Sequence, residues 1–91
     1  MLSYIDSMNS RHRRTLAAVF GRPTASNLAW DDIEALLIAA GCRRIEGSGS
    51  RVKFENKGVI AAFHRPHPAK EAKKYQVEDA RQFLERIGVK P

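Results

Sequence analysis

The sequence contains a single cysteine, Cys42, among its 91 residues. One thiol cannot form an internal disulfide, so the fold does not depend on the cross-links that stabilise many small secreted proteins. No apolar run approaches the roughly 18 residues that a membrane-spanning helix needs. Residues 1–10 also lack the basic-then-apolar order of a signal peptide. We therefore expect a cytoplasmic protein without a membrane partner, in which Cys42 is a small packing residue.

Metal-ligating side chains are also too few and too scattered to predict a metal site. The sequence has three histidines, and two of them, His64 and His67, stand three residues apart in a segment broken by proline. Zinc needs three or four converging ligands, and these histidines together with Cys42 do not provide such a pattern. We therefore expect no metal and no other cofactor.

Negative charge is the scarcer sign, and the excess of positive charge favours a polyanionic partner. Sixteen Lys and Arg residues stand against ten Asp and Glu residues, which gives a formal net charge of +6 at pH 7. Such a partner is a nucleic acid, an acidic protein or an anionic membrane surface, although the same charge also serves solubility alone. The length and the ordinary balance of apolar and charged residues fit a single globular domain over residues 1–91.

Apolar residues at helical spacing predict three helices. The first is expected over residues 11–20 and the last over residues 77–87. The most regular pattern lies between them and ends at Gly41, and Asp31 and Glu34 precede it at the spacing of a capping box. The apolar positions that carry the three patterns are Leu16, Val19 and Phe20, then Ile33, Leu36, Leu37 and Ala40, and finally Val77, Ala80, Phe83, Leu84 and Ile87.

After the second helix the period changes to that of strands. Residues 43–47 predict a short strand, and residues 51–55 alternate basic and apolar side chains, so that Val52 and Phe54 should face the core. Residues 59–64 are continuously apolar, which predicts a central strand. The turns between these segments are rich in glycine, as antiparallel hairpins require. The order predicts an α+β fold with the helices on one face of an antiparallel sheet and the other face open.

This order resembles the double-stranded-RNA-binding fold, α-β-β-β-α, with an additional helix at residues 10–20. Two motifs narrow the resemblance to the HicA toxins of bacterial toxin–antitoxin pairs. Residues 49–54, GSRVKF, are similar to the family's G-S-H-x-x-F signature, and residues 67–74, HPAKEAKK, resemble its H-x-x-K-E-x-K-x segment. The resemblance covers residues 30–88, which we expect to form the core of the RNA-binding domain.

The resemblance implies an endoribonuclease, or mRNA interferase, that cleaves mRNA without a metal and is covered by an antitoxin of the HicB type. In the family the histidine that follows G-S is catalytic, and Arg51 stands at that position here. An arginine can clamp a phosphate but stays protonated, so it cannot act as a general base near neutral pH. The alternatives are therefore a non-catalytic RNA-binding domain of the same fold and a protein that meets only an acidic antitoxin.

Three residues are candidates for the catalytic site. Metal-free RNA cleavage needs a base for the ribose 2′-hydroxyl and an acid for the leaving oxygen, and histidine suits both roles. His67 matches the downstream histidine of the family, and His64 ends the third strand. In an antiparallel hairpin centred near residues 56–57, Arg51 comes within a few residues of His64 across the sheet. Alternatively, both histidines are simply polar residues at a strand end.

Basic side chains around these residues predict an RNA-binding surface. A basic loop that leads into a helix N-terminus is well placed for backbone phosphates, because the charges and the helix dipole act together. A turn of glycine and serine can also contact a phosphate. The candidate RNA-binding residues are Arg43, Arg44, Ser50, Lys53, Lys70, Lys73 and Lys74. The alternative is an ordinary solvated surface.

Overall fold

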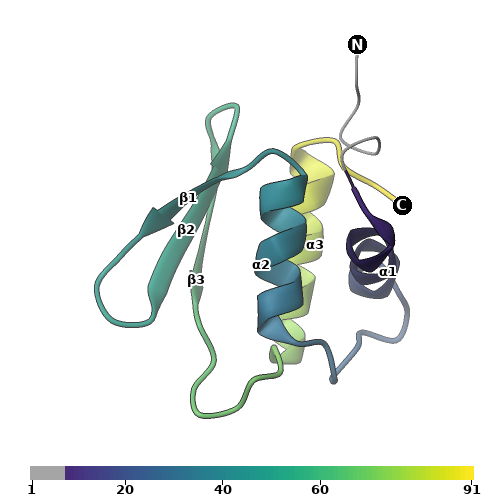
Figure 1. The fold of residues 1–91 in the computed structure, drawn as a ribbon, viewed down its shortest axis with the longest axis horizontal. Helices are drawn as coiled ribbons and strands as arrows, with labels where there is room; N and C mark the ends of the chain where they lie inside the picture. The colour runs from purple at the N-terminus through teal and green to yellow at the C-terminus, as the bar shows by residue number, and fades with distance from the viewer. Residues whose placement is uncertain (1–7) are drawn as a thin grey trace.

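The computed structural model describes residues 8–91, which form three helices and a three-stranded antiparallel sheet. The elements follow in the order α1 (Ser10–Val19), α2 (Trp30–Ala39), β1 (Arg43–Glu46), β2 (Arg51–Asn56), β3 (Val59–His64) and α3 (Lys74–Arg86). This order confirms the expected α+β fold with an additional N-terminal helix (Figure 1). The expectation that residues 1–10 form no signal peptide concerns a stretch that lies mostly outside the described residues.

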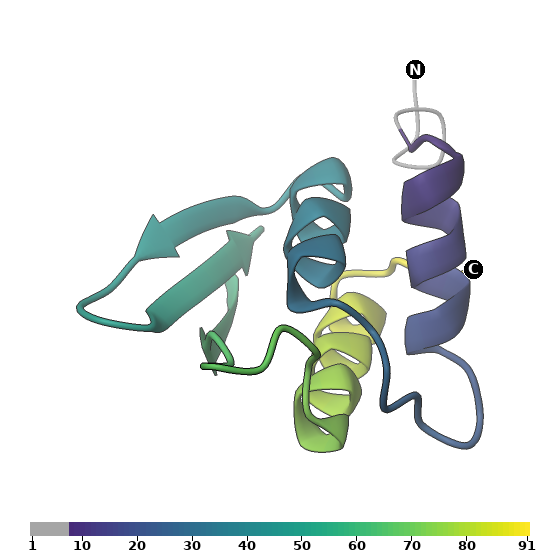
Figure 2. The same cartoon turned by 60° about the horizontal axis from the view of Figure 1, so that its bottom comes forward.

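The elements are arranged in three layers. The sheet packs one face against α2 and α3, and α1 lies on the far side of these two helices (Figure 2). Within residues 8–91, no helix covers the other face of the sheet, as the sequence predicted. The core therefore lies between the sheet and the layer of α2 and α3, and a second apolar contact joins that layer to α1.

The strand order is β1-β2-β3, so β2 is the central strand. The prediction that residues 59–64 form the central strand is therefore wrong, because β3 lies at the edge of the sheet. Its apolar run does not reflect burial on both faces. Ile60, for example, is 53% exposed. Small or apolar side chains on the uncovered face of an edge strand produce the same sequence pattern as a strand that is buried on both sides.

The alternation of basic and apolar residues in β2 correctly predicts which of its side chains are buried. Val52 and Phe54 are both buried against the helices, as predicted. Phe63 of β3 lies beside them, with its ring centroid 6.2 Å from that of Phe54 and 5.2 Å from that of Trp30. These tilted and edge-on contacts are the arrangement that aromatic rings prefer. The rings join the start of α2 to the sheet.

The start of α2 contradicts the predicted capping box. The helix begins at Trp30 with Ala29 as its N-cap, so Asp31 and Glu34 lie inside the first turns. Ala29 has no side chain that could accept a hydrogen bond. The N–H of Trp30 instead donates to the carbonyl oxygen of Lys70 at 2.9 Å. The carbonyl group of Lys70, in the loop before α3, therefore takes part in capping the N-terminus of α2.

The burial pattern of α2 predicts which apolar side chains hold the fold together. Leu36 is fully buried, whereas Ile38 on the same helix is 43% exposed. We expect Leu36→Ala to lower the free energy of unfolding by about 2–5 kcal/mol, because it leaves a cavity in the core. The matched control Ile38→Ala should change it by less than about 1 kcal/mol. Denaturant unfolding followed by circular dichroism measures both, and equal losses would contradict the packing.

Candidate nucleic-acid interface

The uncovered face of the sheet carries cationic side chains from β1 and β2 and a histidine from β3. Residues that lie opposite one another in neighbouring strands point to the same face. Because Val52 and Phe54 point to the helices, their neighbours along β2 and the partners of those neighbours point outward. We call this surface the open face, and it comprises Arg43, Ile45, Arg51, Lys53, Glu55, Ile60, Ala62 and His64.

Arg51 and His64 lie directly opposite each other on the open face. The ladder extends one residue beyond them, since the N–H of Arg65 donates to the carbonyl oxygen of Ser50 at 2.8 Å. The side chains of Ser50, Arg51 and His64 are exposed. Cβ atoms of opposed residues in antiparallel strands lie about 4.5–5.5 Å apart. A guanidinium and an imidazole whose Cβ atoms lie this close together can therefore contact the same phosphate group.

The two arginines of β1 are separated by the sheet. Arg43 lies on the open face, where its Nε is 3.4 Å from Oε1 of Glu55. Arg44 lies on the helical face, where Nη1 is 3.3 Å from Oε1 of Glu34 and Nε is 3.5 Å from Oε2 of Glu46. The structure thus places Arg43 on the same face as Arg51 and Lys53, although at the other end of β2 from Arg51, and it places Arg44 in a set of ion pairs behind the sheet.

Those ion pairs centre on Arg65, which follows β3 directly. Glu34 is only 7% exposed, and its carboxylate accepts from Arg65 Nε at 2.6 Å and from Arg65 Nη2 at 3.2 Å. It also accepts a hydrogen bond from the indole N–H of Trp30. Glu46 binds the other side of the same guanidinium, at 2.8 Å from Nη1 and 3.0 Å from Nη2. We call Glu34, Arg65 and Glu46 the Arg65 cluster.

The sequence patterns did not reveal the Arg65 cluster. The spacing of Asp31 and Glu34 predicts a helix cap, and no pattern distinguishes Arg65 from the other basic residues. One signal was available, because Glu34 occupies the apolar stripe of α2, and a carboxylate among buried side chains needs a cationic partner. The sequence offers sixteen Lys and Arg residues as partners, so spacing alone does not identify Arg65.

The Arg65 cluster keeps its members charged. Burial acts to raise the pKa of Glu34, but the hydrogen bonds from Arg65 and Trp30 outweigh burial and leave that pKa lowered. The hydrogen bond from Arg65 also lowers the pKa of Glu46. The two carboxylates in turn raise the pKa of Arg65. The guanidinium is therefore a fixed cation, and it anchors the end of β3 and the start of the loop that carries His67.

That loop is joined to the segment before α2. The N–H of Trp30 donates to the carbonyl oxygen of Lys70, and the N–H of Ala72 donates to the carbonyl oxygen of Leu28 at 2.8 Å. His67 and Lys70 are exposed on this loop. Two backbone hydrogen bonds and the Arg65 cluster thus hold both ends of a short segment in place.

The first turn of α3 is tied to the end of β3. The helix begins at Lys74, earlier than the predicted residue 77. Gln76 is buried, and its Nε2 donates to the carbonyl oxygen of His64 at 2.6 Å, while its Oε1 accepts from the N–H of Lys73 at 2.9 Å. Lys73 and Lys74 are exposed. These two cations therefore lie at the start of a helix that is bound to the strand carrying His64.

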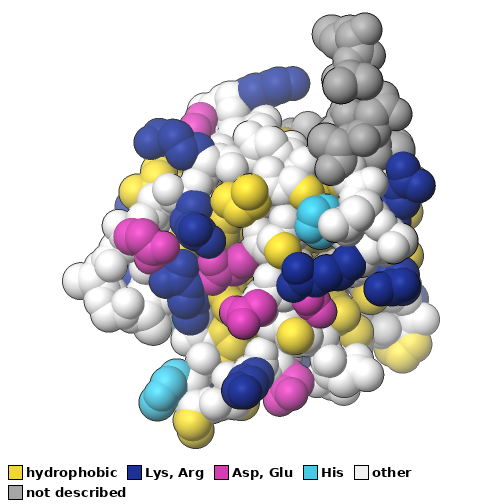
Figure 3. Space-filling model, in the orientation of Figure 1, with side chains coloured by type: hydrophobic (Ala, Val, Ile, Leu, Met, Phe, Trp, Pro, Cys, Tyr) yellow, Lys and Arg dark blue, Asp and Glu magenta, His cyan; other side chains and the backbone are white. Residues whose placement is uncertain are grey.

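The charges on the surface are mixed. In Figure 3, Lys and Arg side chains lie beside Asp and Glu side chains over the sheet and α2. Ion pairs such as Arg11 with Asp32 at 2.6 Å and Arg43 with Glu55 contribute to this mixture. Arg51 and Lys53, by contrast, form no ion pair with any residue in the described part of the chain. They are therefore the cations of the central strand that are available to a ligand.

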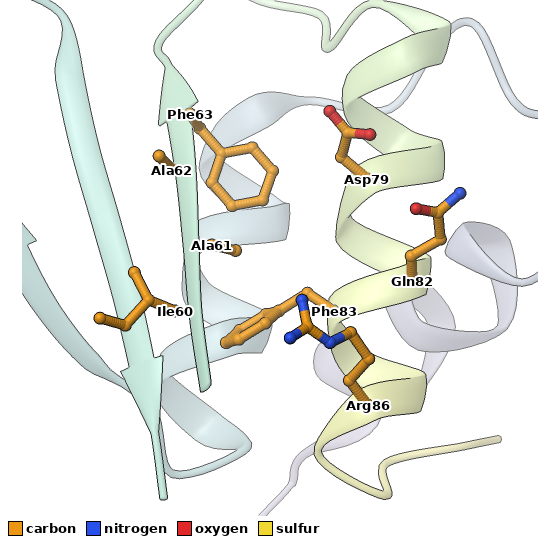
Figure 4. Close-up of a pocket in the computed structure, with 8 residues that line it drawn as sticks. All are labelled: Ile60, Ala61, Ala62, Phe63, Asp79, Gln82, Phe83 and Arg86. Carbon is orange, nitrogen blue, oxygen red and sulfur yellow. The ribbon is translucent and has the colours of Figure 1, made fainter. Parts of the chain in front are cut away.

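Other features of the described chain involve none of the predicted site residues. Burial, with the negative charge of Glu55, raises the pKa of Cys42 to about 11, and the thiol is a packing residue. A hollow of about 200 Å³ between β3 and α3 is lined by Phe63, Asp79 and Arg86, among others, and by none of the predicted site residues (Figure 4). Within residues 8–91, no three His, Cys, Asp or Glu side chains converge as metal ligands.

Comparisons with known proteins point to one family. Residues 30–89, more than half of the chain, match the family model described as the HicA toxin of bacterial toxin–antitoxin. The match begins at the start of α2 and ends just after α3, so α1 lies outside it. No curated protein and no solved structure gives a significant match. Across residues 8–91, no helix is both long and apolar enough to cross a membrane.

The lowered pKa of Glu34 predicts how stability depends on pH. A carboxyl whose pKa is lower in the folded state contributes stability above its ordinary pKa of 4.5, and this contribution disappears as the pH falls through the folded value. We expect Glu34→Gln to lower the free energy of unfolding near neutral pH by about 1–3 kcal/mol and to weaken its decline below about pH 4.5. Denaturant titrations across this range measure both effects. The exposed Glu85→Gln should change neither, and a parallel pH dependence of Glu34→Gln and the unaltered protein would contradict the assignment.

Proposed function

The chain belongs to the HicA family of bacterial toxins, and from this premise we propose that it binds RNA on the open face and cleaves it without a metal. The observation that carries the proposal is the direct opposition of Arg51 and His64. A permanent cation and an imidazole then stand side by side on an exposed surface. These are the two kinds of group that phosphodiester cleavage by the ribose 2′-hydroxyl requires.

Binding rests on cations that are free to meet phosphates. Arg51 and Lys53 project from the central strand, and Lys73 and Lys74 lie at the helix start that is tied to the same end of the sheet. Contacts between cations and the sugar–phosphate chain provide affinity that does not depend on base sequence and that falls with salt. The basic net charge of the whole chain adds long-range attraction to a polyanion.

In the cleavage step His64 acts as the base. Its neutral imidazole takes the proton of a ribose 2′-hydroxyl, and that oxygen attacks the adjacent phosphorus. The bond from phosphorus to the 5′ oxygen of the next nucleotide breaks, and the leaving oxygen takes a proton, for which His67 is the candidate donor. The products are a 2′,3′-cyclic phosphate and a free 5′-hydroxyl. Arg51 binds the non-bridging oxygens and stabilises the charge that develops on them.

The Arg65 cluster supports this chemistry by holding the two histidines in place. Arg65 stands between His64 and the loop segment with His67, and two carboxylates fix its guanidinium. Gln76 binds the backbone of His64 from the other side. A site whose groups are held before the substrate arrives gives up less entropy when it reacts. The catalytic histidines therefore occupy an anchored strand end and an anchored loop.

The replacement at Arg51 favours a second candidate function. In the family signature a histidine stands where this chain has Arg51, and arginine cannot take a proton near neutral pH. In this alternative the open face binds RNA, Arg51 contacts a phosphate, and no cleavage follows.

Membership of the family also implies an antitoxin partner. We propose that this partner is of the HicB type and that it meets the toxin in the cytoplasm, where RNA is available. An acidic surface on the antitoxin would neutralise the cations of the open face and block the approach of RNA. The third possibility, a protein that binds an acidic antitoxin and no RNA, is excluded if the purified chain binds RNA alone.

Substitution of His64 tests the cleavage step. We expect His64→Ala to lower the rate of RNA cleavage about 100-fold or more, because a general base contributes that much, while RNA affinity changes little. The measurement is product formation on a labelled RNA in the presence of a chelator. His12→Ala serves as the control, because α1 lies on the far side of α2 and α3 from the sheet.

Two outcomes would contradict this assignment of roles. Undiminished cleavage by His64→Ala would remove His64 as the base. RNA binding by the unaltered protein without any cleavage would favour the second candidate, and Arg51→His should then confer cleavage on the same scaffold.

Charge reversal on β2 tests the binding surface. We expect Arg51→Glu to weaken RNA binding about tenfold or more and to reduce the slope of log affinity against log salt by about 0.7–0.9 for each phosphate that the variant no longer neutralises. Fluorescence anisotropy with a labelled RNA at several salt concentrations gives both quantities. Arg14→Glu on α1 changes the net charge equally on the far side of the helices. If the two variants bind RNA equally weakly, the open face is not the binding surface.

A further inference from the structure

We propose that the chain holds a nucleobase in a pocket beside His67, and this inference rests on the proposed binding of RNA. The pocket has a volume of about 360 Å³ and lies between the start of α2 and the loop that joins β3 to α3. That volume is within the range of small-molecule sites. Its walls include Trp30 and Asp31 of α2 and Arg65, His67, Ala69 and Lys70 of the loop.

The pocket is formed before a ligand arrives. Its two walls are joined by the hydrogen bond from the N–H of Trp30 to the carbonyl oxygen of Lys70 and by a backbone bridge between Ala29 and Glu71. Arg65 cannot swing away, because Glu34 and Glu46 bind it on both sides. A pocket of this kind orders few groups on binding, which lowers the entropic cost.

Arg65 lines the pocket but has few free hydrogen-bond donors. Hydrogen bonds of 2.6–3.2 Å occupy donors along its edge, and two carboxylates neutralise its charge. It therefore has little left with which to bind a phosphate, although 32% of its side chain is exposed. The plane of a fixed guanidinium is a platform on which nucleobases stack. Two proline rings add apolar wall, as a flat heteroaromatic ligand requires.

Asp31 adds a preference among bases. Its neighbour Asp32 forms an ion pair with Arg11 at 2.6 Å, whereas Asp31 has no ion pair or side-chain hydrogen bond within residues 8–91 and lines the pocket. A free carboxylate accepts hydrogen bonds from exocyclic amino groups, which cytosine, adenine and guanine carry and uracil lacks. Lys70, on the loop wall of the pocket, can meet the phosphate of the bound nucleotide. The geometry thus fits a nucleotide with an amino-bearing base better than it fits phosphate alone.

The position of the pocket connects it to cleavage. His67 lines the pocket. His64 lies three residues before it in the chain, and Gln76 binds the backbone of His64. A base in the pocket places its own ribose and phosphate beside the histidines. The identity of that base would therefore decide which phosphodiester bond is presented for cleavage.

The only tryptophan of the chain reports on the pocket. Trp30 lines it, so a bound base should change the tryptophan emission of the intact protein. We expect CMP, AMP and GMP to change the emission and to bind about tenfold or more tightly than UMP. Ribose 5-phosphate, which carries no base, should give no response. An equal response to ribose 5-phosphate, or to UMP at the same concentration as CMP, overturns the inference.

Two variants with one matched control complete the test. Asp31→Asn should abolish the preference for CMP over UMP, whereas Asp32→Asn should preserve it. Ala69→Phe should fill the pocket and abolish the response to every mononucleotide, with circular dichroism showing that the protein is folded. An unchanged response in Ala69→Phe contradicts the pocket. Failure of the pocket leaves the affinity of the unaltered chain for long RNA intact, whereas failure of the proposed function removes that affinity, so the two results are distinguishable.

Discussion

The arrangement of this protein depends on one guanidinium. Arg65 leaves the end of β3 and is held between Glu34 of α2 and Glu46 of β1, so one side chain joins the helical layer to both edge strands of the sheet. A carboxylate as buried as that of Glu34 is stable only when it is paired, and removing its partner leaves an uncompensated charge in the interior. The same interaction sets the end of β3, where His64 stands, and the start of the loop that carries His67. Scaffold and candidate site therefore share one interaction.

The cations of the chain divide into two groups with different roles. Arg44 and Arg65 are directed to carboxylates on the helical face, and their charge is used within the fold. Arg51 and Lys53 face outward from the central strand without ion-pair partners in the described chain, so they are among the cations that a polyanion can reach. Net charge therefore overstates the positive surface that is free to meet a polyanion. The direction of each side chain, which the strand register sets, decides the difference.

Much of the fold follows from local patterns, and so does part of the candidate site. Helical spacing located three helices, and alternation correctly placed Val52 and Phe54 in the core. A hairpin turn implies antiparallel pairing, which predicts that Arg51 lies near His64, and in the structure the two residues are a direct pair. Predictions from local patterns were wrong where two structural environments give the same pattern of residues. The apolar run of β3 belongs to an edge strand, and the spacing of a capping box at Glu34 conceals a buried carboxylate.

The sequence by itself determined the α+β order of elements, the family and the pairing of residues across the hairpin, because each depends on neighbours a few positions apart or on one turn. Only the tertiary structure decided which strand is central, which carboxylates bind Arg65, and how α2 and the loop before α3 enclose a pocket. These features join residues that stand far apart in the chain, such as Glu34 and Arg65. Many basic residues could have paired with that carboxylate, and the packing of three layers selected Arg65 together with Arg44.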